Sequence, residues 1–278
     1  MKNILVPTDF SEQAENALKV AAQLAHKFNA QIYVLHLIEL PVDMVNPVGE
    51  TRSNDLPEAL FFMKLAKKRF DDLLSRPYLK QLKVYDIVEV NKAFDGILEA
   101  SEKHHCDFVV MGSQGASGLK EMFVGSNTEK VVRTSKVPVL VVKNDHAAFE
   151  VNDFVFATNL ETTGREVLKK VIELADLLKA RLHFVYVNTA NEFVTSNECD
   201  TKLKQYMEGV DFDNYEFHVF NDDSVEQGIL NFSKKINANL MGIATHGRKG
   251  LSHFFNGSIS EDLVNHANSP VITFRLEK

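Results

Sequence analysis

The pattern of strands and helices expected for this chain runs once to about residue 146 and then starts again. A glycine-containing loop in the first half matches one in the second half at a constant offset of 132 residues. The pairs are Gly115 and Gly247, Gly118 and Gly250, Gly125 and Gly257, and Ser126 and Ser258. Self-similarity at a fixed spacing indicates a tandem duplication. We therefore expect two domains of one fold, residues 1–146 and 147–278, with the boundary where Asn-Asp-His-Ala at 144–147 interrupts the pattern.

Each half alternates short apolar runs with stretches of helical period. Strands are expected at 3–6, 31–38, 83–90, 108–111 and 138–142, and again at 154–157, 182–187, 215–220, 240–244 and 270–274. Helices are expected after 11, at 58–75, at 93–105 and after 125, and again at 167–178, 198–208, 224–236 and after 257. This alternation predicts an α/β fold in which right-handed crossovers build a mainly parallel sheet covered on both faces.

Composition narrows the class of protein. A content of 45% hydrophobic and 25% charged residues over 278 positions is that of a globular chain with two ordinary cores. The formal charge of −7 argues against nucleic acid as the main partner, because phosphate-backbone binding needs a basic face. No run of about 18 apolar residues predicts a membrane span, and the N-terminus lacks the apolar core of a signal peptide. Cys106 and Cys199 are too few for a disulfide framework, so we expect a cytoplasmic protein with two buried thiols.

The loop after the strand at 108–111 has the properties of an anion site. Gly112, Gly115 and Gly118 allow a ligand to approach the backbone closely. The segment Gly125–Thr128 then opens a helix, whose first N–H groups and dipole favour an anion, and Ser126 and Thr128 add hydroxyl donors. The alternative is a plain connector in which Ser126 or Asn127 caps the helix. The spacing fits neither a Walker A loop nor the Rossmann fingerprint.

The pattern Gly112-x2-Gly115-x9-Gly125-Ser126 resembles the nucleotide loop of the universal stress protein family. The opening Ile-Leu-Val-Pro-Thr-Asp9 and the closing Val-Pro-Val-Leu-Val-Val142 are similar to that family as well. The whole chain resembles two such domains in tandem. This resemblance implies a five-stranded parallel sheet per domain, in the order 3-2-1-4-5, with helices on both faces. It also implies that some members bind ATP or AMP and that others bind no nucleotide.

The resemblance assigns a set of ligand-binding positions in the first repeat. They are Pro7, Thr8, Asp9, Leu37, Met111, Gly112, Gly115, Gly125, Ser126, Asn127 and Thr128. It implies that Asp9 faces the adenosine, where its carboxylate accepts hydrogen bonds from ribose hydroxyls or helps to hold Mg²⁺. Leu37 would pack on the adenine, and the start of the helix at Gly125 would hold the phosphates. Such a ligand lies outside the carboxyl ends of strands 1 and 4, the topological switch point of the sheet.

The second repeat departs from this pattern. Asn159 stands at the position of Asp9 and removes the charge, whereas Ala244 replaces the first loop glycine and adds a methyl group. His246, Arg248 and Lys249 act in the other direction by bringing positive charge to the loop. We expect the first repeat to be the main nucleotide site and the second to serve mainly as a packing partner.

Other candidate sites have simpler explanations. His104 and His105 end a helix, where a cationic side chain is favoured, and no metal-binding spacing accompanies them. Ser113 and Ser126 follow glycines, but a GxSxG elbow is absent, so no catalytic triad and no catalytic residue is expected. The helix face at Lys64–Arg69 is expected to be solvated, and Phe61-Phe62 and Phe254-Phe255 to lie in a core or an interface.

Three functional hypotheses remain open. The first is a non-enzymatic, ATP- or AMP-binding regulator of the stress response. The second is a ligand-free or differently liganded interaction module, and the third is a slow ATPase that depends on bound metal. The resemblance implies a homodimer. The two repeats are also expected to pair Val139–Val142 with Val271–Phe274 inside one chain, which removes two exposed sheet edges.

Overall fold

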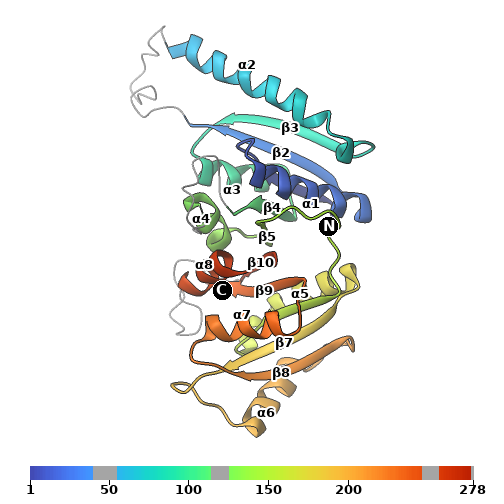
Figure 1. Ribbon diagram of the computed structural model, residues 1–278, viewed down its shortest axis with the longest axis vertical. Coiled ribbons are helices and arrows are strands. Elements are labelled where there is room, and N and C mark those ends of the chain that lie inside the picture. Colours follow the sequence, from blue (N-terminus) through green and yellow to red (C-terminus); the bar gives the residue numbers. More distant parts are fainter. Residues whose placement is uncertain (40–54, 114–124, 246–256, 277–278) are drawn as a thin grey trace.

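The protein is described by a computed structural model for residues 1–39, 55–113, 125–245 and 257–276. Ten strands form one continuous sheet along the long axis of the molecule, with the first repeat at one end and the second at the other (Figure 1). The strands are β1 (Asn3–Pro7), β2 (Gln31–Ile38), β3 (Lys83–Val90), β4 (Phe108–Gly112), β5 (Val139–Val142), β6 (Asp153–Ala157), β7 (Arg181–Asn188), β8 (Tyr215–Asn221), β9 (Leu240–Thr245) and β10 (Val271–Arg275). The helices are α1 (Glu12–Phe28), α2 (Asp55–Leu74), α3 (Ala93–Lys103), α4 (Ser126–Thr134), α5 (Arg165–Leu178), α6 (Ser196–Tyr206), α7 (Val225–Lys235) and α8 (Gly257–His266), with short 3-10 segments η2 (Pro77–Leu79) and η3 (Thr162–Gly164).

The strand order across the sheet is β3-β2-β1-β4-β5-β10-β9-β6-β7-β8. Each repeat contributes five parallel strands in the order 3-2-1-4-5, which confirms the expected fold. The sequence places α2 three residues too late at its start and does not predict η2 or η3. Among the described residues, no helix is both long and apolar enough to cross a bilayer.

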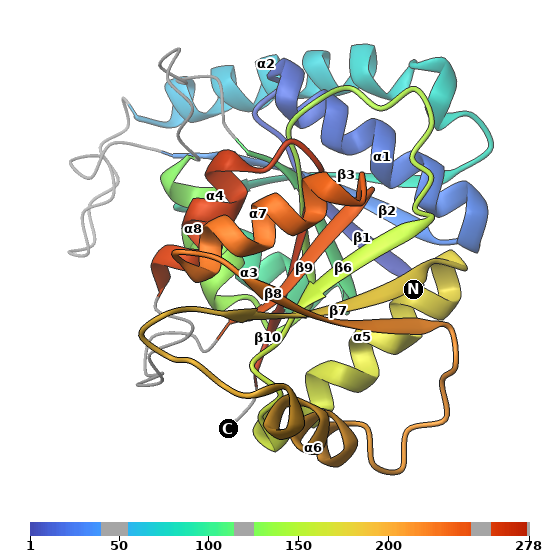
Figure 2. The same cartoon turned by 60° about the horizontal axis from the view of Figure 1, so that its bottom comes forward.

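Alternation along the strands produces two hydrophobic cores, one on each face of the sheet. In β1, Ile4 and Val6 point to one face and Leu5 to the other, as expected for a two-residue period. The first core lies under α1, α2, α5 and α6, and the second under α3, α4, α7 and α8. Figure 2 shows α7 and α8 on the opposite side of the second repeat's strands from α5 and α6. Both cores include residues of both repeats, so the two halves share their hydrophobic interior.

The two repeats are joined by antiparallel pairing of β5 with β10. Val141 lies opposite Val271, and Val139 lies opposite Thr273, which confirms the pairing expected from the sequence. In each repeat a basic side chain donates a hydrogen bond to a backbone carbonyl at the end of a helix in the other repeat. Lys143 Nζ donates to the carbonyl of Asn265 at the end of α8. Arg275 Nη1 donates at 2.7 Å to the carbonyl of Thr134 at the end of α4. Both side chains donate at the carboxyl end of a helix, where a cation is favoured, while burial of Lys143 opposes its charge.

Candidate functional site

A cavity of about 360 Å³ opens in the first repeat at the carboxyl ends of β1, β2 and β4. It is lined by Pro7, Thr8, Asp9, Ala14, Leu35, His36, Leu37, Ala93, Ile97, Met111, Gly112, Gly125, Ser126, Asn127 and Thr128. The sheet order reverses here, because β1 is followed by β2 on one side and has β4 on the other. Ten of the eleven residues predicted for the site line this cavity, and Gly115 lies outside the described residues. The volume falls in the range of small-molecule pockets, about 300–1,000 Å³.

A tight turn between β1 and α1 holds Asp9 at the cavity. Asp9 Oδ1 accepts a hydrogen bond from the N–H of Ser11 at 3.0 Å, and Thr8 Oγ1 accepts one from the N–H of Phe10 at 3.0 Å. Phe10 takes a left-handed backbone conformation with φ of 63°, and Ser11 then caps α1 by accepting from the N–H of Ala14. The chain thus turns sharply after the strand, and the carboxylate of Asp9 is placed by the backbone of its own turn.

His36 is a lining residue that the sequence reasoning did not assign to the site. Its Nδ1 lies 2.9 Å from the carbonyl oxygen of Thr8, and its ring packs on Phe10 with centroids 4.6 Å apart. A carbonyl only accepts, so Nδ1 carries a hydrogen and donates it to Thr8. Neighbours on a strand point to opposite faces, yet Leu37 and His36 both line this cavity. They do so because the cavity lies at the end of the strand.

One wall of the cavity is apolar. Leu37, Ile97 and Met111 contribute it, and the close approach of α3 fixes the position of Leu37. A Cβ atom added to Gly96 on α3 would lie 2.6 Å from Leu37 Cδ2, so a larger residue at this position would require Leu37 to shift. An apolar wall of this kind suits the face of a flat aromatic ring.

The start of α4 forms another part of the cavity lining. Gly125 is the N-cap residue and no side chain caps the helix there, so neither Ser126 nor Asn127 has the capping role considered above. The first N–H bonded within the helix is that of Glu129, to the carbonyl of Gly125 at 3.1 Å. The preceding N–H groups, at 126 to 128, therefore have no intrahelical acceptor and are placed to meet an anion.

Two of the predicted site residues, Thr128 and Gly112, make contacts that stabilise the fold around the cavity. Thr128 is buried, and its hydroxyl donates to the carbonyl of Gly112 at 3.0 Å, so the expected hydroxyl donor role is left to the exposed Ser126. A Cβ atom on Gly112 would lie 2.9 Å from the backbone of Gln13, so this glycine is needed where α1 crosses β4. The N–H of Gly125 donates to the carbonyl of Ser113 at 2.8 Å and closes the loop between them. These contacts hold the start of α4 against the end of β4.

The second repeat builds the same turn beside a smaller cavity. Thr158 Oγ1 accepts from the N–H of Leu160 at 3.0 Å, and Asn159 Oδ1 accepts from the N–H of Glu161 at 3.2 Å. The cavity at this turn lies on the α5 and α6 side of the sheet, opposite to that of the first-repeat cavity. It measures about 20 Å³ and is lined by Phe156, Ala157, Thr158, Asn159, Glu161, Gly164, Val167, Tyr206, Ala244 and Leu276. Ile259, at the position of Asn127, is buried in the hydrophobic core. The predicted loop residues His246, Arg248 and Lys249 lie outside the described residues.

Of the residues set aside in the sequence, His104 and the two cysteines lie as expected, whereas Phe61 and Phe62 are exposed on α2 and not packed in a core. Phe254 and Phe255 lie outside the described residues. His104 occupies the C-cap position of α3 and its ring stacks on Tyr33 at 5.0 Å. Cys106 and Cys199 are free and buried, and burial raises the pKa of the Cys106 thiol to about 12. These thiols are therefore protonated, inert members of the core at neutral pH.

The molecule is thus a tandem, doubly wound α/β protein with a ligand-sized cavity at one switch point. The model of the universal stress protein family matches residues 1–143 and 151–275, so the chain belongs to this family. A universal stress protein of Methanocaldococcus jannaschii is 33% identical over 159 residues, which are 52% of this chain and 97% of the relative. A universal stress protein of Synechocystis is 22% identical over 291 residues, covering 99% of this chain and all of the relative (100%).

A solved structure supports the arrangement of the two repeats. The crystal structure of a universal stress protein from Archaeoglobus fulgidus superposes with a TM-score of 0.73, covering 99% of this chain and 97% of that one. The two sequences are 22% identical, so this likeness concerns the fold.

Proposed function

We propose that the first repeat binds an adenine nucleotide, ATP or AMP, and that the chain acts as a non-enzymatic regulator of the stress response. The observation that carries the proposal is that the predicted residues from four separate segments line one cavity of about 360 Å³. The segments are the end of β1, the end of β2, the end of β4 and the start of α4. Membership of the universal stress protein family supports the same role.

The cavity offers one environment for each part of a nucleotide. The apolar wall at Leu37 and Met111 suits the adenine ring, and the carboxylate of Asp9 suits the ribose hydroxyls as an acceptor. The N–H groups at the start of α4 and the hydroxyl of Ser126 suit the phosphates. None of the described lining residues is a lysine or arginine. A Mg²⁺ ion carried by ATP would therefore offset the repulsion between its phosphates and Asp9.

The proposal is tested by calorimetric titration of the nucleotide-stripped protein with ATP and with AMP. We expect saturable binding of one nucleotide per chain, and its loss in Gly125→Val, whose side chain would fill the approach to the helix N-terminus. The matched control is Gly257→Val, the same change in the second repeat, which should leave binding in place. Absence of heat and of a thermal shift with the wild-type protein at millimolar nucleotide would refute the proposal.

We propose binding without efficient turnover. The described lining of the cavity supplies neither a lysine nor an arginine to neutralise charge on a transferring phosphoryl group. Phosphate release from ATP should therefore stay close to the background rate. A rate well above background that disappears in Gly125→Val would establish the slow ATPase instead.

The homodimer and the interaction-module hypothesis depend on a different surface. Pairing of β5 with β10 uses both inner sheet edges within one chain, so a second copy must bind elsewhere. The helix α2 exposes Leu60, Phe61, Phe62, Met63 and Leu65, with Phe61 62% exposed. These residues point to several sides of the helix, and we propose this exposed apolar segment of α2 as the contact between two copies. Light scattering should then show a dimer that Phe61→Asp converts to a monomer, whereas a monomeric wild type would remove the proposal.

The finer assignments of domain boundary and location also stay proposals. We place the boundary between the repeats at residues 146 and 147, inside the segment between the two family matches. Residues of this segment are held on α1, where Gln23 accepts from the N–H of Phe149 at 2.6 Å and donates to the carbonyl of His146 at 3.0 Å. We further propose a cytoplasmic location, which fractionation of the native host would test.

A further inference from the structure

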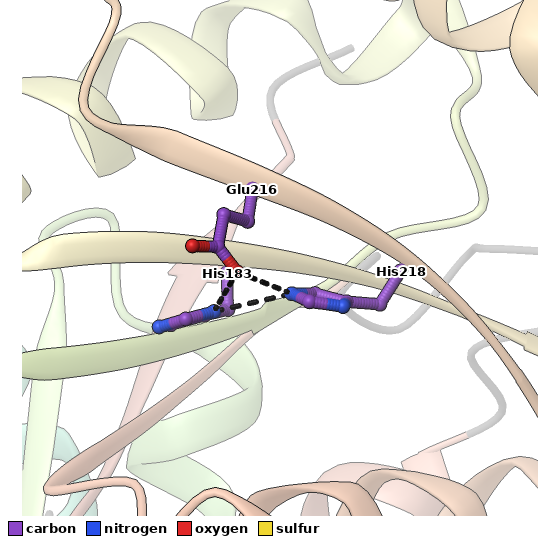
Figure 3. A group of neighbouring side chains, drawn as sticks. All are labelled: His183, Glu216 and His218. Carbon is purple, nitrogen blue, oxygen red and sulfur yellow. Dashed lines mark hydrogen bonds and ion pairs between the residues drawn. The ribbon is translucent and has the colours of Figure 1, made fainter.

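Three side chains with metal-binding atoms converge on one face of the second repeat. His183 on β7 lies directly opposite Glu216 on β8, and His218 follows two residues later on the same face. Figure 3 shows the two imidazoles and the carboxylate pointing toward one another. His183 Nδ1 lies 3.2 Å from His218 Nε2, and Glu216 Oε2 lies 3.7 Å from the first nitrogen and 3.5 Å from the second.

We propose that His183, Glu216 and His218 bind a divalent transition-metal ion of the Zn²⁺ class. Zinc bonds of about 2.0–2.2 Å in tetrahedral geometry place neighbouring ligand atoms roughly 3.3–3.6 Å apart. The three separations in this cluster lie around that value, so an ion can be placed between the atoms with small side-chain shifts. Two imidazoles and one carboxylate favour zinc over Mg²⁺ or Ca²⁺, which prefer all-oxygen sites.

Neighbouring residues orient two of the three ligands. Asp153 Oδ1 on β6 lies 2.9 Å from His183 Nε2, so that nitrogen carries the hydrogen, and the lone pair of Nδ1 faces the cluster. Arg181 Nη1 donates to Glu216 Oε1 at 3.1 Å, which leaves Oε2 to face the two imidazoles. A carboxylate on the far nitrogen of a ligating histidine is the usual outer contact of zinc sites.

The cluster is anchored on one side and accessible on the other. The side chain of His183 is 7% exposed, whereas those of His218 and Glu216 are 28% and 47% exposed. The ring of His218 packs on Phe232 of α7 with centroids 4.7 Å apart, and burial lowers its pKa, which favours the uncharged imidazole that binds metals. An ion can therefore enter from solvent, and water can occupy a fourth ligand position.

The first repeat has no such cluster at the matching positions of its described residues. Tyr33 and Tyr85 replace His183 and Glu216 and stack on each other at 5.0 Å, and Ile87 replaces His218. The proposed metal site is therefore a property of the second repeat, and it lies far along the strands from the turn that matches the nucleotide cavity. Its role is to tie the edge strand β8 to β7 and β6.

The direct test is titration of ZnCl₂ into chelator-treated, untagged full-length protein. We expect one zinc ion per chain, and an affinity at least tenfold lower in His218→Ala and in Glu216→Gln, since each removes a ligand. Asp153→Asn should weaken binding by about 10–100-fold while keeping all three ligands, as outer-contact changes do. The matched control is His26→Ala, which removes an exposed histidine at the end of α1 and should change nothing.

Cobalt substitution provides a second readout. Co²⁺ bound in tetrahedral geometry should give visible absorption bands that His218→Ala abolishes and His26→Ala preserves. The alternative is a hydrogen bond between the two histidines with no ion, in which His218 Nε2 donates to His183 Nδ1. Lack of saturable zinc binding by the wild type, or equal affinity in wild type and His218→Ala, would establish that alternative.

Discussion

The two repeats form the same turn after their first strand but differ in the space beside it. In both, a threonine hydroxyl and the side-chain oxygen of the next residue accept hydrogen bonds from N–H groups of the turn. The acceptors are Thr8 and Asp9 in the first repeat and Thr158 and Asn159 in the second. The cavity of about 360 Å³ beside this turn in the first repeat lies on the α3 and α4 side of the sheet, whereas the space of about 20 Å³ beside the turn in the second repeat lies on the α5 and α6 side. The same local geometry therefore accompanies different surroundings in the two repeats.

This comparison separates what the fold requires from what a ligand would require. The turn needs only an acceptor oxygen, and Asn159 supplies it as well as Asp9 does. The turn itself therefore does not require the negative charge of Asp9, and the proposed contact with a ligand would use it. In the same way, the start of α4 needs no amide at 127, since Ile259 occupies the matching place in the core of the second repeat.

The second repeat differs in the opposite sense along its strands. There His183, Glu216 and His218 stand where the first repeat has two stacked tyrosines and an isoleucine. Both repeats keep the buried apolar positions that build the shared cores. The surface ends and edges of the strands thus differ, and within the described residues each repeat carries a polar cluster that the other lacks.

The strongest way to break the comparison is to give the first repeat the residue of the second at 127. Asn127→Ile should fill the cavity and weaken nucleotide binding by about 100-fold or more, or ~2.7 kcal/mol, because the apolar side chain occupies the phosphate end. Calorimetry measures this loss, and thermal unfolding should show a chain at least as stable as the wild type.

The reverse change, Ile259→Asn, serves as the counterpart. It places an amide in the buried core of the second repeat and should lower the free energy of unfolding by about 2–4 kcal/mol. Nucleotide affinity of the first repeat should be unchanged in this variant. If Asn127→Ile binds nucleotide as tightly as the wild type, the ligand does not lie at the start of α4.

A smaller effect is expected at Asp9, because the turn forms with either aspartate or asparagine at this position. Asp9→Asn keeps the acceptor for the N–H of Ser11 but removes the charge, so affinity should fall by about tenfold, or ~1.4 kcal/mol, with little change in stability. Calorimetry and thermal unfolding of the same preparation measure the two quantities. The control Asn159→Asp should alter neither. A large loss of stability in Asp9→Asn would show instead that the charge serves the fold.

The fold was predictable because its signals are local and repeated. Short apolar runs, helical periods and the constant offset of the glycine loops define ten strands in two equal sets. The pairing of β5 with β10 followed from the need to cover two exposed edges. The start of η3 was not predictable, because one turn of 3-10 helix replaces the first turn of an α-helix without a change in the apolar pattern.

The position of the candidate site was predictable, but not the contacts of its residues. The switch point is fixed by strand order, and ten predicted residues lie there. Thr128 bonds to the carbonyl of Gly112, and Gly112 leaves room for the backbone of α1. The sequence alone does not reveal these contacts, because they depend on how α1 and α4 pack against β4. The sequence indicates even less that His183 and His218 lie close together, since this depends on the register of β7 against β8.

The joint between the repeats offers the smallest test of their difference, because its two crossed cations are Lys143 and Arg275. Burial lowers the pKa of Lys143 from 10.5 to about 8, whereas arginine stays charged throughout. Between these two values the unfolded chain holds a proton that the folded chain has lost, so the free energy of unfolding rises with pH in this window. Across this pH window we expect the free energy of unfolding of the wild type to rise by on the order of 1 kcal/mol relative to that of Lys143→Met. This is less than the full pKa shift implies, because the carbonyl of Asn265 partly solvates the cation.

Denaturant unfolding of both proteins at a series of pH values measures this difference and cancels the other groups that titrate in the same range. Those groups include Cys106, whose raised pKa of about 12 makes the folded state lose stability as pH rises above the ordinary thiol value. The matched variant is Arg275→Met, in which Lys143 still titrates. Its free energy of unfolding should therefore differ from that of the wild type by an amount that stays constant across this pH window. A difference between wild type and Lys143→Met that stays flat from pH 8 to 10.5 would show that Lys143 keeps its proton and reaches solvent at the joint.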